Sequence, residues 1–158
     1  MNRSVYITRL ASFLPNDPVS NEEMENILGK INNQASKAKP LILRNNQIKT
    51  RYYASDKQGN TTHTNTELTK LAVEKLFDEN FRLEDVQVLS CGTTSPDQLL
   101  PAHAAMVHGA LGSHAVEINS TTGACSAGIQ ALKFGYLSVL SGTASNAVCT
   151  GSERFSIW

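Results

Sequence analysis

This sequence of 158 residues has few cysteines, no excess of charge of either sign and no long apolar run. Each of these absences excludes a class of protein. The 3 cysteines are widely spaced and form no Cys-x-x-Cys pair, so neither a disulfide framework nor a cysteine metal site is expected. The 14 basic residues balance 14 acidic ones, which argues against nucleic acid and anionic membranes as partners. No stretch approaches the roughly 20 apolar residues that span a membrane, and the N-terminus lacks the pattern of a secretory signal.

Glycine and proline are also few, with 10 and 5 copies, while 41% of the residues are hydrophobic. This composition indicates an ordered globular protein that is long enough for one domain with a sizeable core. The 4 histidines include no pair four residues apart, so a helical two-histidine metal site lacks its geometry. We therefore expect a soluble, cytoplasmic protein without a bound metal.

Helix-like and strand-like segments alternate along the chain. Capping boxes of the type Ser/Thr-x-x-Glu at 20–23 and 64–67 predict two helix starts. Pro101 is expected at the first position of another helix, and residues 41–43 are expected to resume buried structure. The expected strands are 4–14, 85–90, 115–119 and 146–151, and the expected helices are 20–29, 64–80, 102–111 and 125–141. The strand-helix-strand-helix-strand order of the later part predicts a parallel sheet.

The most informative stretch is 119–128, where a strand runs through a turn of small residues into a helix. This order places Cys125 at a helix start, where free N–H groups and the helix dipole favour the nucleophilic thiolate. The small neighbours leave room for a long substrate, and the Cys125 N–H is placed to hold an acyl oxyanion. The helix that follows is apolar nearly all round, which predicts that it is buried. On spacing alone, a structural cysteine in the core is an equally good interpretation.

Several motifs along the chain carry a resemblance to a known family. They are the opening segment 5–14, RNNQIKTR at 44–51, CGTTSP at 91–96 and TGACSAG at 122–128. In these motifs the sequence resembles the β-ketoacyl-acyl-carrier-protein synthase III group of condensing enzymes, which have the thiolase fold. The resemblance implies an α/β thiolase-like half with a central, mixed but mostly parallel sheet, helices on both faces and a buried nucleophile helix. It also implies that residues 1–158 form one N-terminal thiolase-like domain.

The resemblance implies roles for particular residues. Cys125 would be the acylated cysteine. Thr94 would line the acyl pocket and Leu100 would reach into the neighbouring subunit of a dimer, while a strand-end hydroxyl and a loop anchor are equal alternatives. Arg44, Lys49 and Arg51 would receive the phosphate of phosphopantetheine or CoA, and a solvated basic strand edge is at least as good an interpretation.

The activity implied is that of an acyltransferase in fatty acid or polyketide-like synthesis, without a cofactor. Cys125 takes an acyl group from a thioester, and a carbanion from a second, carrier-bound substrate attacks that group in a Claisen-type condensation. Acyl carrier protein or acyl-CoA would be the partner, and a homodimer is expected. Cys91 and Cys149 lie in expected strand interiors and should be inert, and packing is the expected role of the histidines. Two alternatives stay open: a hydroxymethylglutaryl-CoA synthase-like enzyme and a non-catalytic partner subunit of a condensing enzyme.

Two departures from the family pattern narrow this expectation. The family's tryptophan before the entrance arginine has no counterpart at 39–41, and Gln47 stands where a glycine is usual. These departures count against a CoA-linked starter, and residues 43–54 resemble the branch that makes dialkylresorcinols and cyclohexanediones. The family has about double this length, with its catalytic His and Asn in the later half. We therefore expect a truncated piece or an N-terminal domain that accepts an acyl group without completing a condensation.

Overall fold

A computed structural model describes residues 4–112 and 114–155. The chain divides into two compact units. The first consists of the described parts of Met1–Phe13 and Asn65–Glu153, and the second of the described parts of Leu14–Thr64 and Arg154–Trp158. The assignment of the whole chain to one domain stays a prediction.

The first unit is built on a three-stranded parallel sheet in the order β4-β3-β5. Its strands are β3 (Val88–Gly92), β4 (Glu117–Thr121) and β5 (Val148–Gly151). At the carboxyl ends of the strands, Gly92 pairs with Thr121 on one side and with Gly151 on the other. The loops that follow these strands therefore begin at one edge of the sheet, which is where parallel α/β sheets hold their functional groups.

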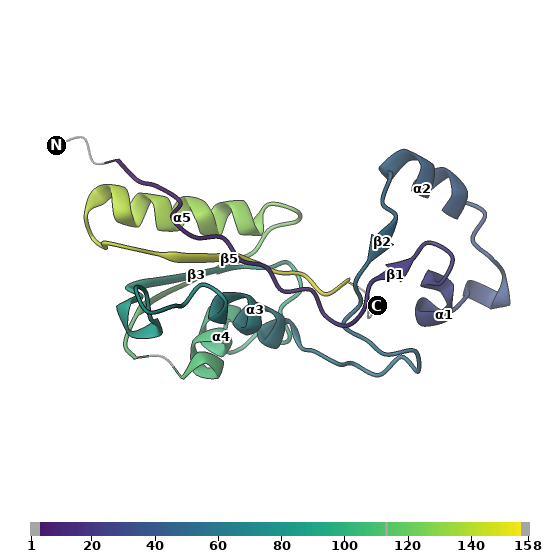
Figure 1. Cartoon of the computed structure of the whole chain (residues 1–158), viewed down its shortest axis with the longest axis horizontal. Helices are drawn as coiled ribbons and strands as arrows, with labels where there is room; N and C mark the ends of the chain where they lie inside the picture. The colour runs from purple at the N-terminus through teal and green to yellow at the C-terminus, as the bar shows by residue number, and fades with distance from the viewer. Residues whose placement is uncertain (1–3, 113, 156–158) are drawn as a thin grey trace. The chain divides into compact units, whose positions relative to one another are not determined.

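Helices cover both faces of this sheet, as Figure 1 shows. The helices α3 (Asn65–Glu74) and α4 (His103–Leu111) lie on one face, and α5 (Ala127–Ser141) lies on the other. A short 3-10 helix, η2 (Leu83–Asp85), precedes β3. The core of the unit consists of Val73, Val86, Leu89, Cys91, Ala104, Val107 and Val148. The predicted α/β class, with a parallel sheet and helices on both faces, is confirmed.

The structure corrects the expectation that the helix after Cys125 is buried all round. Only one stripe of α5 is buried, formed by the small residues Ala127, Ala131, Gly135 and Ser138. Small side chains at helical spacing let the helix backbone lie close to the sheet. Most of the larger apolar side chains are exposed, and they are Ile129, Leu132, Tyr136, Leu137 and Leu140. Apolar composition alone does not reveal which part of a helix surface its own chain covers.

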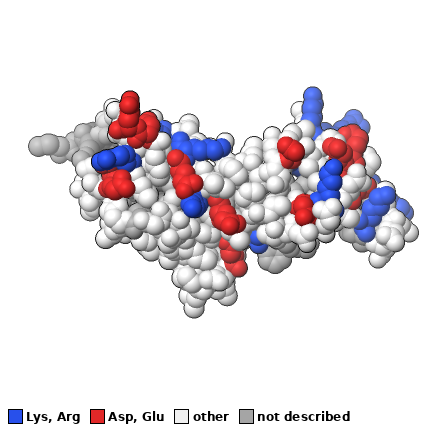
Figure 2. Space-filling view, turned by 60° about the horizontal axis from the view of Figure 1, so that its bottom comes forward, with Lys and Arg blue, Asp and Glu red and all other residues white. Residues whose placement is uncertain are grey.

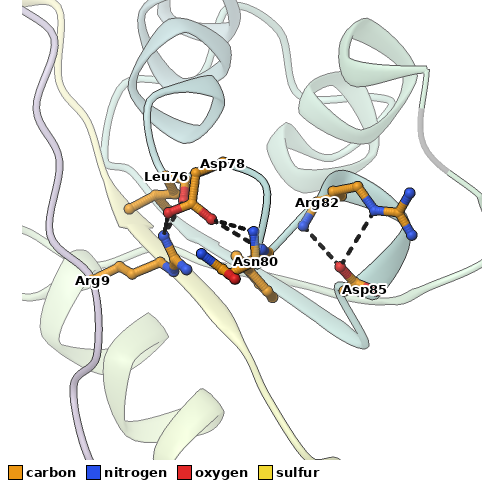
Figure 3. Close-up of polar contacts among 7 residues, drawn as sticks. Arg9, Leu76, Asp78, Asn80, Arg82 and Asp85 are labelled. Atoms are coloured by element: carbon orange, nitrogen blue, oxygen red, sulfur yellow. Dashed lines mark hydrogen bonds and ion pairs between the residues drawn. The ribbon is translucent and has the colours of Figure 1, made fainter.

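Residues 4–13 do not form the expected strand. Side-chain contacts hold this segment in the first unit: Arg9 donates a hydrogen bond to the Leu76 carbonyl (3.4 Å) and forms an ion pair with Asp78 (Figure 3). Asp78 is itself fixed, because its carboxylate accepts the Asn80 N–H at 2.8 Å. The strand prediction is wrong because an extended, partly apolar segment is held here by side chains instead of a backbone ladder.

The second unit contains short elements. They are β1 (Val19–Ser20), α1 (Met24–Leu28), the 3-10 helix η1 (Ile31–Asn33), α2 (Lys39–Asn46) and β2 (Thr50–Arg51), with β1 and β2 antiparallel. The first capping box forms as predicted, since Ser20 N donates to the Glu23 carboxylate (3.2 Å) and Glu23 N donates to Ser20 Oγ (3.3 Å). The prediction of buried structure at 41–43 is wrong, because Leu41 and Ile42 lie on α2 and are 62% and 56% exposed.

The helix ends in the first unit follow the glycine pattern of the sequence. Gly112 and Gly142 end α4 and α5 in the left-handed conformation, with φ values of 65° and 83°. At the other end of α4, Ala102 is the capping residue and His103 is the first helical residue. Pro101 therefore precedes the cap, and its predicted place at the first helical position is wrong.

Acidic and basic side chains intermingle on the face of the molecule drawn in Figure 2, in keeping with the 14 residues of each sign. The longest helix, α5, has 15 residues, against the roughly 20 needed to cross a bilayer. None of the helices within 4–112 and 114–155 is long and apolar enough to span a membrane.

Candidate functional site

Cys125 lies in the turn between β4 and α5, beyond the carboxyl end of the sheet. It directly precedes Ser126, the residue that caps α5, and it is exposed. Its φ angle of 61° lies in the left-handed region, which residues other than glycine rarely adopt. Such a conformation persists only where the surrounding structure holds it, and strained residues of this kind cluster at functional sites. The structure thus places Cys125 at a helix start, and the alternative of a core cysteine does not fit its exposure.

The carbonyl of Gly123 organises this turn. It accepts hydrogen bonds from Ser126 N at 3.1 Å and Ala127 N at 3.2 Å. A third donor comes from the loop after β3, where Thr94 Oγ1 lies 3.2 Å from the same oxygen. Within the described residues, no hydrogen-bond partner is seen for the Cys125 amide. A backbone N–H beside a thiol is the kind of donor that stabilises the oxyanion of an acyl transfer.

Thr94 is brought next to the Cys125 turn, although the two residues belong to different loops. Its hydroxyl donates to Gly123 (3.2 Å), and its backbone N–H donates to Glu153 Oε1 (2.7 Å). The side chain is exposed at the surface of the unit. The family resemblance implies that Thr94 lines an acyl pocket, and the structure adds that its hydroxyl contacts the turn that carries the cysteine. Its role toward a substrate stays a prediction.

Glu153 is the residue at this edge that the sequence analysis missed. Its carboxylate accepts hydrogen bonds from the backbone of Thr94 (2.7 Å) and Ser95 (3.2 Å), and from the hydroxyls of Ser95 (2.8 Å) and Thr93 (3.4 Å). Burial raises the pKa of Glu153. The hydrogen bonds from Ser95 and Thr94 together lower it by more, so the pKa lies below its usual value. The stabilisation by this carboxylate is therefore complete at neutral pH and is lost as the pH falls through the lowered pKa. The sequence signal that could have identified Glu153 is an acidic residue shortly after the third parallel strand, β5.

A buried histidine, His103, lies close enough to Glu153 to feel its charge. His103 is 3% exposed, and its Nε2 is within hydrogen-bonding distance of Thr69 Oγ1 (3.2 Å) and Ser152 Oγ (3.4 Å). Burial lowers the pKa of His103, while the nearby carboxylates of Asp97 and Glu153 act in the opposite direction. The net lowering favours the neutral ring at neutral pH, which agrees with the packing role expected for the histidines.

The other two thiols occupy the strand interiors where the sequence placed them. Cys91 is fully buried in β3, and burial raises its pKa to about 11. Cys149 is half-buried in β5, and burial also raises its pKa. These surroundings fit the prediction that both residues are inert.

We expect iodoacetamide at neutral pH to alkylate Cys125 first in the folded chain. A thiol with a pKa of about 11 is ionised in only about one molecule in 10⁴ at pH 7, so Cys91 should react only after denaturation. The measurement is a time course of alkylation at each cysteine, read by peptide mass spectrometry. Equal rates at Cys125 and Cys149 would instead favour a non-catalytic partner subunit.

The remaining predicted site residues lie in three other segments of the chain. Leu100 lies in the loop before α4 and is 85% exposed. Arg44 is exposed in the last turn of α2. Arg51 lies in β2, where its guanidinium donates to Asn21 Oδ1 at 2.6 Å and lies 3.7 Å from Met24 Sδ. Both arginines belong to the second unit. Their binding of a phosphate, and the contact of Leu100 with a partner subunit, stay predictions.

No protein-family model matches this sequence. A curated relative, the β-ketoacyl-[acyl-carrier-protein] synthase III of Rhizorhabdus wittichii, is 31% identical over 157 residues, which are 99% of this chain and 45% of the relative. This chain is a homologue of the β-ketoacyl-[acyl-carrier-protein] synthases III. It spans less than half the length of curated synthases III that it matches.

Solved structures agree with this homology. AbyA1, a tetronic acid condensing enzyme, has a TM-score of 0.78 at 28% identity, with 92% of this chain and 43% of that chain covered. The β-ketoacyl-[acyl-carrier-protein] synthase III of Thermus thermophilus has a TM-score of 0.73 at 25% identity, covering 95% and 43% of the two chains. The predicted resemblance to the synthases III and the predicted thiolase fold are confirmed.

Proposed function

We propose that this chain is the acyl-accepting part of a condensing enzyme of the β-ketoacyl-[acyl-carrier-protein] synthase III type. The Cys125 thiolate attacks the carbonyl of an acyl thioester, the bond from that carbonyl to the donor sulfur breaks, and the donor leaves as a thiol after taking up a proton. The acyl group remains on Cys125. A carbanion, formed when the second substrate loses carbon dioxide or a proton, then attacks this acyl group, forms the carbon–carbon bond and releases the thiolate.

The observation that carries this proposal is the geometry of Cys125. The thiol is exposed, stands at the head of α5 in a left-handed conformation and has an adjacent backbone N–H available to a bound oxygen. Nucleophilic attack on a thioester needs an accessible thiolate and a donor for the oxygen that becomes negatively charged. In Cys125 an accessible sulfur and such a donor belong to one residue, while the other two thiols of the chain are buried or half-buried.

The partners in this proposal are acyl carrier protein or acyl-CoA, and a second copy of the chain. Relatives named for acyl carrier protein support the first. Leu99 and Leu100 are 86% and 85% exposed, and neighbouring exposed apolar side chains are typical of a surface that another subunit covers.

Three free cysteines fit a reducing compartment, which supports a cytoplasmic location. Thr94 belongs to the acyl pocket, and Arg44 and Arg51 to the phosphate site, in this proposal.

The test is incubation of the chain with an acyl-acyl-carrier-protein and, separately, with the same acyl-CoA, followed by intact-mass analysis. We expect one acyl adduct, located on Cys125 by peptide mapping, and no condensed product when a malonyl-carrier substrate is added. Acylation by the CoA donor alone would favour the hydroxymethylglutaryl-CoA synthase-like alternative. An absence of adduct with both donors, or an adduct on Cys91 or Cys149, contradicts the proposal.

A further inference from the structure

The loop after β3 is held by the carboxylate of Glu153 and by the side-chain amide of Asn65, which donates to Thr93 Oγ1 and to the Ser95 carbonyl at 2.8 Å each. Four donors of residues 93–95 point to Glu153: Oε1 accepts one backbone N–H, and Oε2 accepts one backbone N–H and two hydroxyls. Glu153 follows β5, so the contact joins the ends of two adjacent parallel strands. Hydrogen bonds to an ionised acceptor are stronger than those between neutral groups.

This loop is also tied to the turn that carries the cysteine. Thr94 makes both connections, because its N–H donates to Glu153 and its hydroxyl donates to the Gly123 carbonyl. That carbonyl closes the turn by accepting the amides of Ser126 and Ala127. A continuous chain of contacts therefore runs from the carboxylate through Thr94 to the turn containing Cys125.

We propose that Glu153 is a positioning residue that acts through Thr94 to hold the Cys125 turn in the geometry required for acyl transfer. This inference rests on the proposed function for its consequence in catalysis. The positioning itself is a property of the hydrogen-bond network and can be measured without a substrate.

A carboxylate suits this position better than an amide of the same shape. Every group that faces Glu153 in these contacts is a donor, and both carboxylate oxygens are used. A glutamine offers one acceptor and one NH₂ group, so one of its ends would place a donor against a donor. Two other ionisable groups of this region are His103, whose pKa is lowered by burial, and Asp97, whose carboxylate caps α3 through Asn65 N (2.8 Å). Neither replaces the negative charge at the loop of residues 93–95.

The first experiment measures amide hydrogen exchange in Glu153→Gln. We expect the amides of Ser126 and Ala127, which bond to the Gly123 carbonyl, to exchange about 10-fold faster than in the parent chain because the turn opens more often. The matched control is Glu117→Gln, the same substitution in an exposed position at the opposite end of the sheet. Unchanged protection of the two amides in Glu153→Gln would overturn the positioning role.

The second experiment compares two reactions of Cys125. We expect Glu153→Gln to slow acylation by an acyl thioester about 10-fold or more, because that reaction needs the oxyanion donor in place. Alkylation by iodoacetamide, which forms no oxyanion, should change less than about threefold. A parallel fall in both rates together with a lower melting temperature would indicate general destabilisation and overturn the inference.

Thr94→Val provides an independent variant that removes only the hydroxyl donor. It should reproduce the faster exchange and slower acylation, and the double variant should add little, because both changes break one chain of contacts. Additive effects would contradict a shared path. If the parent chain accepts no acyl group, the proposed function fails while the exchange data still decide the positioning role of Glu153.

Discussion

Cys125→Ser is expected to abolish formation of the acyl adduct, with a fall in acylation rate of at least about 10³-fold. A serine hydroxyl keeps the shape of the turn but is un-ionised at neutral pH and far less nucleophilic than a thiolate. The measurement is intact-mass analysis over time with an acyl-carrier-protein donor, at equal concentrations of variant and parent chain.

Cys149→Ala is the matched control for this substitution, because it removes the half-buried thiol of β5 and leaves the turn intact. It should be acylated at the rate of the parent chain. An adduct that persists in Cys125→Ser, or disappears in Cys149→Ala, would show that the nucleophile has been assigned to the wrong cysteine.

Gly92→Ala is expected to have the largest effect on stability. A Cβ at this position, the last residue of β3, would lie less than 3.0 Å from backbone atoms of Ala127 and Gly128, where α5 begins. Backbone cannot rotate away as a side chain can, so the helix start must shift. We expect a loss of about 3 kcal/mol in the free energy of unfolding, which corresponds to a fall in melting temperature of about 6–12 °C.

The same substitution at Gly109 provides the contrast. Gly109 lies in α4 and has no atom within 4 Å of the place where a Cβ would stand. Gly109→Ala should therefore stabilise the chain by about 0.5–1 kcal/mol, since alanine favours the helix. Differential scanning calorimetry of the two variants measures both effects, and similar melting temperatures would contradict the close packing of α5 on β3.

The burial of α5 shows a limit of predicting structure from sequence patterns. Its apolar residues predicted a helix covered on every side, yet only the stripe of small residues faces the sheet. Leu137 is 47% exposed and Ile129 is 69% exposed. An apolar side chain favours any dry surface, and its sequence position does not say whether that surface belongs to the same unit.

Glu153 shows a second limit of predicting structure from sequence patterns. The residues that donate to its carboxylate lie 58 to 60 positions earlier in the chain. No local pattern connects such distant residues, and only the parallel pairing of β3 with β5 brings them to one edge. Thr94 was singled out from a motif, but its link to the Cys125 turn depends on the same strand pairing.

Short-range features were determined by the sequence itself: the capping box at 20–23, the glycine ends of α4 and α5, the strand-helix order and the position of Cys125 at a helix start. These depend on hydrogen bonds and backbone preferences within about four residues. Tertiary structure decided which face of α5 is covered, why residues 4–13 stay outside the sheet and how Glu153 reaches the loop beside Cys125. Those features require groups far apart in the chain to meet, and their energies exist only once the strands are paired.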